Sequence, residues 1–190
     1  MPLLFFRRAE VDPLPLSMSG VKLGERLLQI GVDDGLLAGL LAAKTGLSGT
    51  AAHVVSDEDQ AVKARLGAKK AGVLSEIRIA MLDQLPYEDG AFDIVVIHSA
   101  AGQLAQATPA ERSAVLQACR RVLRPGGRLV AIEPGTPSGL KSMFRAGPAA
   151  QAGYDSSGGT LSALQDAGFF PVRELGDREG LKFVEGLRTT

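Results

Sequence analysis

The 190-residue sequence has one cysteine, two histidines and no excess of charge of either sign. The single cysteine, Cys119, has no partner for an intrachain disulfide, and we expect it to be a small buried apolar residue. Lysine plus arginine and aspartate plus glutamate number 21 each, which argues against a nucleic-acid-binding surface built on phosphate neutralisation. With so few histidines and cysteines, a zinc site is not expected either.

Long apolar runs are also missing. None reaches the roughly 20 residues that a membrane-spanning helix requires. The N-terminal segment Pro2–Phe6 is too short for the apolar region of a secretion signal, and two arginines follow it instead of preceding it. We therefore expect a cytoplasmic protein, whose length fits one domain with a substantial core.

The stretch at residues 27–37 reads as a strand, a glycine turn and a helix in immediate succession. An apolar run leads to Gly31, and Asp34 is placed to cap a helix that ends near Gly46. In an open α/β sheet, a nucleotide-like cofactor binds just outside the carboxyl end of such a strand, next to the helix N-terminus. This turn is therefore the candidate binding site.

Strands and helices alternate along the rest of the chain. Apolar runs predict strands at residues 26–30, 51–55, 76–80, 92–97, 128–133, from 169 and at 180–186. Helix starts are predicted at Ser56 with Asp59, at Thr108 with Pro109 and Glu111, and at Thr160. This spacing predicts an α/β fold, a Rossmann-like, doubly wound and mostly parallel sheet of about seven strands with helices on both faces. The last two strands leave no room for a helix between them, so they should pair antiparallel at one edge, with the last strand antiparallel in the sheet.

Two segments lack a regular pattern. Residues 1–22 contain three prolines and are expected to form an irregular arm, whose Phe5 and Phe6 are candidates for packing on the core or on a second copy in a homodimer. Residues 134–160 are rich in glycine and proline, which predicts a flexible loop of the kind that often serves as a lid or a binding loop. By this interpretation residues 23–190 form a single domain.

Three short motifs lie at corresponding points before predicted strands. They are LPYEDGAFD at residues 85–93, RVLRPGGRL at 121–129 and AGF at 167–169. In order and spacing they resemble class I S-adenosylmethionine-dependent methyltransferases, over about residues 23–186. The resemblance implies S-adenosylmethionine as cofactor and a small-molecule methyl acceptor, as in the ubiquinone and menaquinone type of these enzymes.

The resemblance also assigns cofactor positions at the first three strand ends, several of them substituted. They are Gln29, Gly31, Asp33 and Gly35 in the turn, Val55 and the nearby Asp57 for the ribose, and Met81 and the nearby Asp83 for the adenine. Gln29 stands where the family has an acidic residue, and Asp33 replaces the middle glycine, where it would face the carboxylate of the cofactor. Losing two or three charge-assisted hydrogen bonds weakens binding by roughly 3–8 kcal/mol where nothing compensates.

Other polar residues are candidates for substrate chemistry. His98 ends the fourth strand and is the candidate general base, although hydrogen bonding alone also explains a histidine there. Glu133, at the end of the fifth strand, would contact substrate or cap its loop. Asp33 and Asp34 would bind a cationic group, or Asp34 would cap the helix beside an exposed Asp33. The candidates for an apolar acceptor pocket, or for core packing, are Met143, Phe144 and Phe170.

Two functions remain open at this point. The first is a small-molecule methyltransferase that works mainly by aligning its acceptor with the activated methyl group. The second is a catalytically inactive protein of the same fold, a pseudoenzyme with an interaction or regulatory role and weak or no cofactor binding. A nicotinamide-dependent oxidoreductase is disfavoured, because the turn at residues 31–35 lacks the Gly-x-Gly-x-x-Gly spacing.

Overall fold

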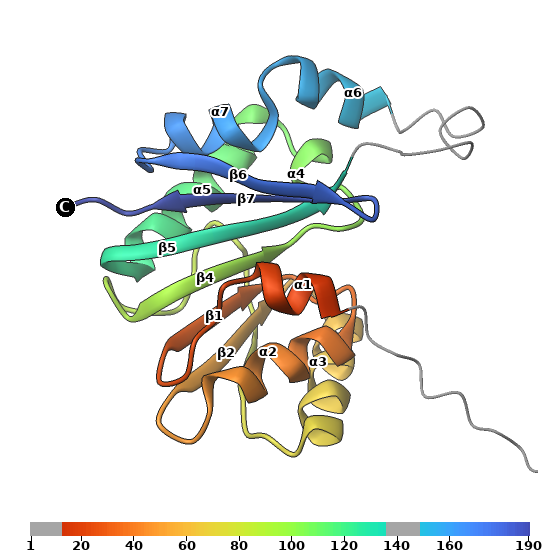
Figure 1. Ribbon diagram of the computed structural model, residues 1–190, viewed down its shortest axis with the longest axis vertical. Coiled ribbons are helices and arrows are strands. Elements are labelled where there is room, and N and C mark those ends of the chain that lie inside the picture. Colours follow the sequence, from red (N-terminus) through yellow and green to blue (C-terminus); the bar gives the residue numbers. More distant parts are fainter. Residues whose placement is uncertain (1–12, 136–148) are drawn as a thin grey trace, which may run out of the picture.

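The computed structural model of the chain describes residues 13–135 and 149–190, in which a seven-stranded sheet is covered by helices (Figure 1). The strands are β1 (Arg26–Ile30), β2 (Thr50–Val55), β3 (Glu76–Ile79), β4 (Phe92–His98), β5 (Leu123–Pro134), β6 (Val172–Arg178) and β7 (Leu181–Leu187). The helices are α1 (Pro13–Met18), α2 (Gly35–Thr45), α3 (Glu58–Ala71), α4 (Gln103–Gln106), α5 (Pro109–Val122), α6 (Ala149–Ser156) and α7 (Gly159–Asp166).

The strand order in the sheet is β3-β2-β1-β4-β5-β7-β6. Strands β1 to β5 pair in parallel, whereas β7 pairs antiparallel with both β5 and β6. The predicted Rossmann-like fold, with an antiparallel last strand, is thus confirmed. From β1 the chain adds β2 and β3 on one side of the sheet, and it then returns to add β4 and β5 on the other side of β1. Ligands of open α/β sheets bind in the crevice at such a point.

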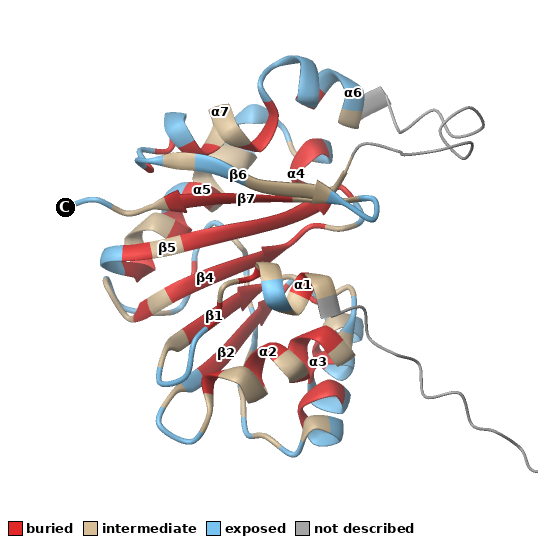
Figure 2. Ribbon diagram, viewed as in Figure 1, coloured by how far each residue is buried: buried red, intermediate tan, exposed pale blue. Residues whose placement is uncertain are grey.

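The two faces of the sheet bury separate apolar clusters. In β4, Val95 and Ile97 pack with residues of α5 and α7, while Ile94 and Val96 pack with residues of α2. Burial on both faces accounts for the almost continuous apolar run of this strand. Figure 2 shows the buried residues following β4, β5 and β7 through the molecule.

The helix starts test the capping predictions. Asp34 caps α2, and Thr108 with Glu111 forms a capping box at α5, both as predicted. The prediction of Ser56 as the cap of α3 is wrong, because Asp57 accepts a hydrogen bond from the backbone N–H of Gln60 at 2.9 Å. A carboxylate is the stronger acceptor and is favoured by the helix dipole.

Both segments predicted to be irregular contain a helix. Residues 13–18 form α1, whose two prolines fall within its first turn, where proline is tolerated. Residues 149–156 form α6, inside the predicted loop. Phe5, Phe6, Met143 and Phe144 lie outside the described residues. Of the helices in the described ranges, none has the length and apolar character needed to cross a membrane.

Glycines bring α2 and α3 into direct backbone contact. A Cβ added to Gly67 would overlap the carbonyl group of Gly35, and one added to Gly35 would overlap the carbonyl group of Lys63. Gly39 is equally close to the backbone of Gly67. This crossing sets α2 against α3 beside the carboxyl edge of the sheet.

Candidate functional site

A cavity of about 140 Å³ lies at the carboxyl edge of the sheet, beside the ends of the adjacent strands β1 and β4. Its walls come from the ends of β1, β2 and β4, from the segment after β3, and from α3, α4 and α5. Ligand pockets for drug-sized molecules usually measure about 300–1,000 Å³, so this cavity encloses only part of such a ligand. Its position is the one expected for the ligand site of this fold.

Gly31 forms the turn that follows β1. Its φ of +74° belongs to the left-handed region, and a Cβ here would lie 2.9 Å from the carbonyl oxygen of His98. Glycine is therefore required at this position by both conformation and space. Gly35, by contrast, is required by the contact between α2 and α3, so the two glycines of the motif have different roles.

Asp33 occupies the middle position of the motif and is half-buried, not exposed as predicted. Its two carboxylate oxygens accept hydrogen bonds from Nε2 of Gln103, at 2.8 and 2.9 Å. Asp34, its exposed neighbour, accepts a hydrogen bond from the N–H of Leu36 at 2.9 Å. The Asp33–Gln103 pair joins the β1 turn to α4 across the cavity.

Gln60 ties the same turn to the end of β2. Its Oε1 accepts the N–H of Val32 at 2.9 Å, and its Nε2 donates to Oγ of Ser56 at 2.8 Å. We did not predict either Gln60 or Gln103 as a site residue. Their partners in the β1 turn, Val32 and Asp33, are 28 and 70 residues away, and a glutamine in a helix carries no local signal of such a bond.

The positions predicted for ribose binding do not offer a carboxylate to the cavity. Val55 is fully buried in an apolar cluster that includes Val32 and Ala61. Asp57 is exposed, and the backbone hydrogen bond from Gln60 is the largest cause that lowers the pKa of its carboxyl group. Its oxygens thus serve as the cap of α3.

The positions predicted for adenine binding also lie outside the cavity walls. Met81 is 62% exposed and Asp83 is exposed, while Leu82 between them lines the cavity. No acidic residue is among the cavity-lining residues of the described chain. The structure therefore brings together Gly31 and His98, but not Val55, Asp57, Met81 or Asp83.

His98 carries the unsatisfied polar atom of the cavity. The residue is 6% exposed, it lines the cavity, and its buried Nδ1 has no hydrogen-bond partner. Burial lowers the pKa of His98, against the smaller raising effect of Asp33 and Asp34. At neutral pH the ring is therefore uncharged and can exchange one hydrogen bond with a ligand.

Gln29 lies below the turn instead of in the cavity. Its Nε2 donates to the carbonyl oxygen of Gly31 at 3.1 Å, and its Oε1 is buried without a partner. In the parallel register it is next to His53 of β2, which is also fully buried. Gln29 supports the turn, and His53 belongs to the interior, as predicted for the latter.

A buried polar cluster lies beside the cavity, at the carboxyl end of β5. Glu133 accepts a hydrogen bond from the hydroxyl of Thr160, which is 2.8 Å from the hydroxyl of Tyr154. The guanidinium of Arg112, a cavity residue, lies 4.1 Å from the centre of the Tyr154 ring. Burial raises the pKa of Glu133, and it raises that of Tyr154 to about 12. Glu133 is thus engaged with neighbouring side chains.

Two further sequence predictions concern apolar residues. Cys119 is fully buried in α5, as predicted, and burial raises the pKa of its thiol. Phe170 is 70% exposed, and its N–H donates to the carbonyl oxygen of Leu187 at 2.9 Å. Because β7 runs antiparallel to β5, Leu187 is at the opposite edge of the sheet from the cavity. Neither of the two alternatives for Phe170, an acceptor pocket or core packing, is therefore correct.

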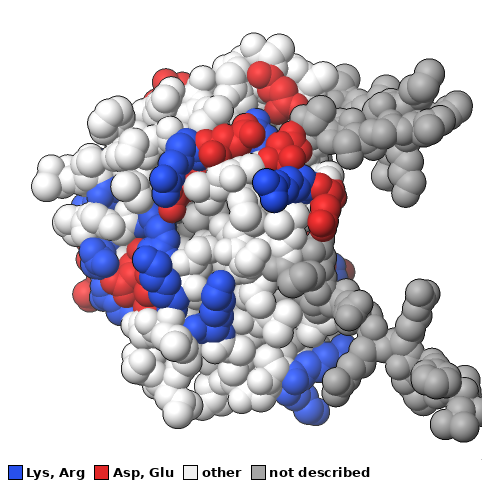
Figure 3. All heavy atoms as spheres, in the orientation of Figure 1, with Lys and Arg blue, Asp and Glu red and all other residues white. Residues whose placement is uncertain are grey.

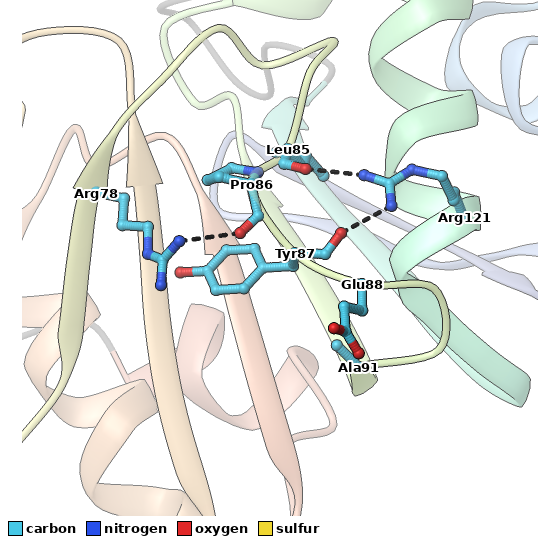
Figure 4. Close-up of a pocket in the computed structure, with 7 residues that line it drawn as sticks. All are labelled: Arg78, Leu85, Pro86, Tyr87, Glu88, Ala91 and Arg121. Atoms are coloured by element: carbon cyan, nitrogen blue, oxygen red, sulfur yellow. Dashed lines mark hydrogen bonds between the residues drawn. The ribbon is translucent and has the colours of Figure 1, made fainter.

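A second, open hollow surrounds the LPYEDG motif (Figure 4). Arg121 donates to the carbonyl oxygens of Tyr87 and Leu85 at 2.7 and 2.8 Å, and Arg78 donates to that of Pro86 at 3.0 Å. These arginines hold the loop, so the motif is part of the scaffold. On the face seen in Figure 3, positive and negative side chains are intermingled, without a large field of one sign.

S-adenosylmethionine, the cofactor implied by the resemblance, fits these residues in part. The glycine turn and the unpartnered nitrogen of His98 suit a ligand at the ends of β1 and β4. The ribose and adenine contacts that the family resemblance implies are absent from the cavity walls of the described chain.

Comparisons with known proteins agree with this fold. A family model described as a methyltransferase domain matches residues 28–131. The ubiquinone/menaquinone biosynthesis C-methyltransferase UbiE of Teredinibacter turnerae is 33% identical over 135 residues, which cover 64% of this chain and 48% of that protein. UbiE of Idiomarina loihiensis is 29% identical over 127 residues, covering 64% and 47%. The chain thus spans about half the length of these relatives.

The structural comparison extends over more of the chain. A SAM-dependent methyltransferase from Aquifex aeolicus superposes with a TM-score of 0.75 at 20% identity, covering 94% of this chain and 90% of that one. One from Methanosarcina mazei has a TM-score of 0.63 at 20% identity, covering 94% and 98%. At these identities the likeness establishes the fold.

Proposed function

We propose that this chain, which belongs to the methyltransferase domain family, binds S-adenosylmethionine at the cavity beside the carboxyl ends of β1 and β4 and methylates a small molecule. Family and fold imply this cofactor. The observation that carries the proposal is the contact of Gly31 with the His98 backbone beside an unpartnered Nδ1. The acceptor class follows the names of the UbiE relatives, which act in quinone biosynthesis, and we propose a small quinone precursor.

His98 has the properties of a general base or an acceptor-orienting group. Its ring is held uncharged by burial, and it lies on the cavity wall. Most of the rate enhancement would come from alignment of the acceptor and exclusion of water, with His98 as the one base among the cavity residues.

Calorimetric titration of the full chain with S-adenosylmethionine tests the proposal. We expect a dissociation constant of about 0.1–1 mM, weaker than micromolar because charge-assisted contacts to ribose and adenine are missing. His98→Gln should weaken binding or abolish turnover with quinone precursors while leaving the thermal midpoint nearly unchanged. Asp59→Asn, on the exposed first turn of α3, is the matched control that should behave as wild type.

The second candidate function is a non-catalytic protein of this fold that acts through interactions. It is favoured by the bond between Gln60 and the Val32 N–H, by the apolar Val55 and by the small cavity. Absence of heat at millimolar S-adenosylmethionine would support this candidate and contradict the methyltransferase.

We also propose that the protein is a cytoplasmic homodimer formed through its N-terminal arm. The support is the run of five apolar residues, Pro2–Phe6, at the start of the sequence. Light scattering after gel filtration should give twice the chain mass for wild type and a monomer for Phe5→Ser/Phe6→Ser. A monomeric wild type at about 100 μM, where dimers of ordinary affinity persist, contradicts the dimer. Cell fractionation tests the location.

A further inference from the structure

We infer that this cavity selects ligands that carry a cationic group and no carboxylate. The inference rests on the proposed function, because it concerns the ligand of the same site. An adenosyl sulfonium with a free amine and no carboxylate, such as decarboxylated S-adenosylmethionine, is the ligand class that it favours over S-adenosylmethionine.

The rim of the cavity is acidic on the side of the β1 turn. The Asp33 carboxylate lies 2.8 Å from Nε2 of Gln103, a cavity residue, and Asp34 follows it in the chain. Both carboxylates raise the pKa of His98, a cavity residue, although burial has the larger and opposite effect. A ligand carboxylate that enters here meets two like charges, whereas an ammonium group meets two opposite ones.

Two of the backbone N–H groups that commonly receive an anion at such a turn already have partners. Backbone N–H groups at a helix N-terminus bind anions in many nucleotide sites. Here the N–H of Leu36 is bonded to Asp34, and the N–H of Val32 is bonded to Gln60. An incoming carboxylate would have to displace a side chain from either of them.

Arg112, the positively charged residue of the cavity wall, already has hydrogen-bond partners. Arg112 donates through Nε to the carbonyl oxygen of Leu104 at 2.7 Å and through a terminal nitrogen to that of Ala107 at 2.8 Å. Its guanidinium also stacks on Tyr154. Arg112 therefore holds α4 and the segment that follows it, and it is not directed at the acidic rim.

A second observation, independent of the two carboxylates, also points to a ligand at this cavity: the unpartnered Nδ1 of His98. His98 lines the cavity, and its buried Nδ1 has no partner, although buried polar atoms are nearly always hydrogen-bonded. A ligand donor at this position, with an ammonium group near Asp33, would satisfy both groups at once. The uncharged ring adds no positive charge that would compensate a carboxylate.

The test compares three ligands by calorimetry on the full chain: S-adenosylmethionine, its decarboxylated form and 5′-methylthioadenosine. We expect the decarboxylated ligand to bind at least about tenfold more tightly than S-adenosylmethionine, a factor that corresponds to 1.4 kcal/mol. In Asp33→Asn, which keeps the size of the side chain and an oxygen for Gln103, the ratio should fall to about threefold or less.

The outcomes separate this inference from the proposed function. Asp59→Asn removes the same charge outside the cavity and should leave the ratio unchanged. Equal or tighter binding of S-adenosylmethionine in wild type overturns the inference and leaves the proposed function standing. A ratio that falls equally in both variants overturns it too, because net charge would then be the cause. If none of the three ligands binds, the proposed function fails together with the inference.

Discussion

Gly67→Ala is expected to lower the free energy of unfolding by about 3 kcal/mol, at the upper end of what overpacking usually does. The added methyl group would overlap the carbonyl group of Gly35, so α2 and α3 must move apart along their whole crossing. Alanine has the higher helix propensity by about 1 kcal/mol, and this gain is too small to offset the overlap. Chemical denaturation followed by circular dichroism measures the change.

Gly153→Ala is the matched control for this variant. Gly153 lies within α6, and a Cβ built on it has no neighbouring atom within 4 Å. We expect stabilisation by about 0.5–1 kcal/mol, because only the helix propensity changes. If both variants shifted stability in the same direction, the contact between α2 and α3 would not be as close as the glycines indicate.

Gly67→Ala also has a consequence for ligand binding at the cavity. Gln60 on α3 bonds to Val32, just before α2, so the separation of the helices is transmitted to the β1 turn. In a Gly67→Ala protein that still folds, ligand affinity at the cavity should therefore fall as well.

Local patterns predicted the parts of the fold that local chemistry determines. The apolar runs located the strands, and the Thr108 box and the Asp34 cap were correct because each satisfies backbone groups within three residues. Ser56 was wrong by one residue, since the carboxylate of Asp57 caps α3 and the hydroxyl of Ser56 donates to that carboxylate. Helices α1 and α6 were missed because prolines and glycines weaken the helical pattern, and neighbouring elements compensate.

The site was less predictable, because its contacts join distant residues. The glycine motif led to Gly31 and Gly35, but the sequence does not reveal that Gly35 serves helix packing. The bond from the Gln103 side chain to Asp33 spans 70 residues, and the bond from the N–H of Val32 to the Gln60 side chain spans 28. The family motif shows that Asp33 replaces a glycine. It does not show which distant side chain forms a hydrogen bond with Asp33.

Gln29, which stands where the family has an acidic residue, has a second buried polar residue beside it in the sheet, His53. The two are paired in register between β1 and β2, and both are fully buried. Neither nitrogen of His53 has a hydrogen-bond partner, and neither does Oε1 of Gln29. Two uncharged polar side chains are accommodated here under α2 and α3, whereas a charged imidazole would have no compensation.

The burial of His53 predicts that the protein loses stability in acid. It lowers the pKa of His53 to about 4, against 6.5 for the free side chain. As the pH falls from 6.5 to 4, the unfolded chain takes up a proton that the folded chain does not, so stability is lost over this window. Each pKa unit corresponds to about 1.4 kcal/mol, which gives a total loss of about 3 kcal/mol.

His53→Leu should remove this loss. Leucine has a similar volume and no nitrogen to desolvate, so the variant should be as stable as wild type, or more stable, at neutral pH. Denaturation curves at about pH 7 and at about pH 4.5 give the difference between the two proteins. Burial raises the pKa of Glu133, so this residue favours the folded protein as the pH falls, opposite to His53. Wild type and His53→Leu share this contribution, and it cancels when the two proteins are compared. Parallel pH profiles of the two proteins would mean that His53 has a polar partner in solution and is protonated normally.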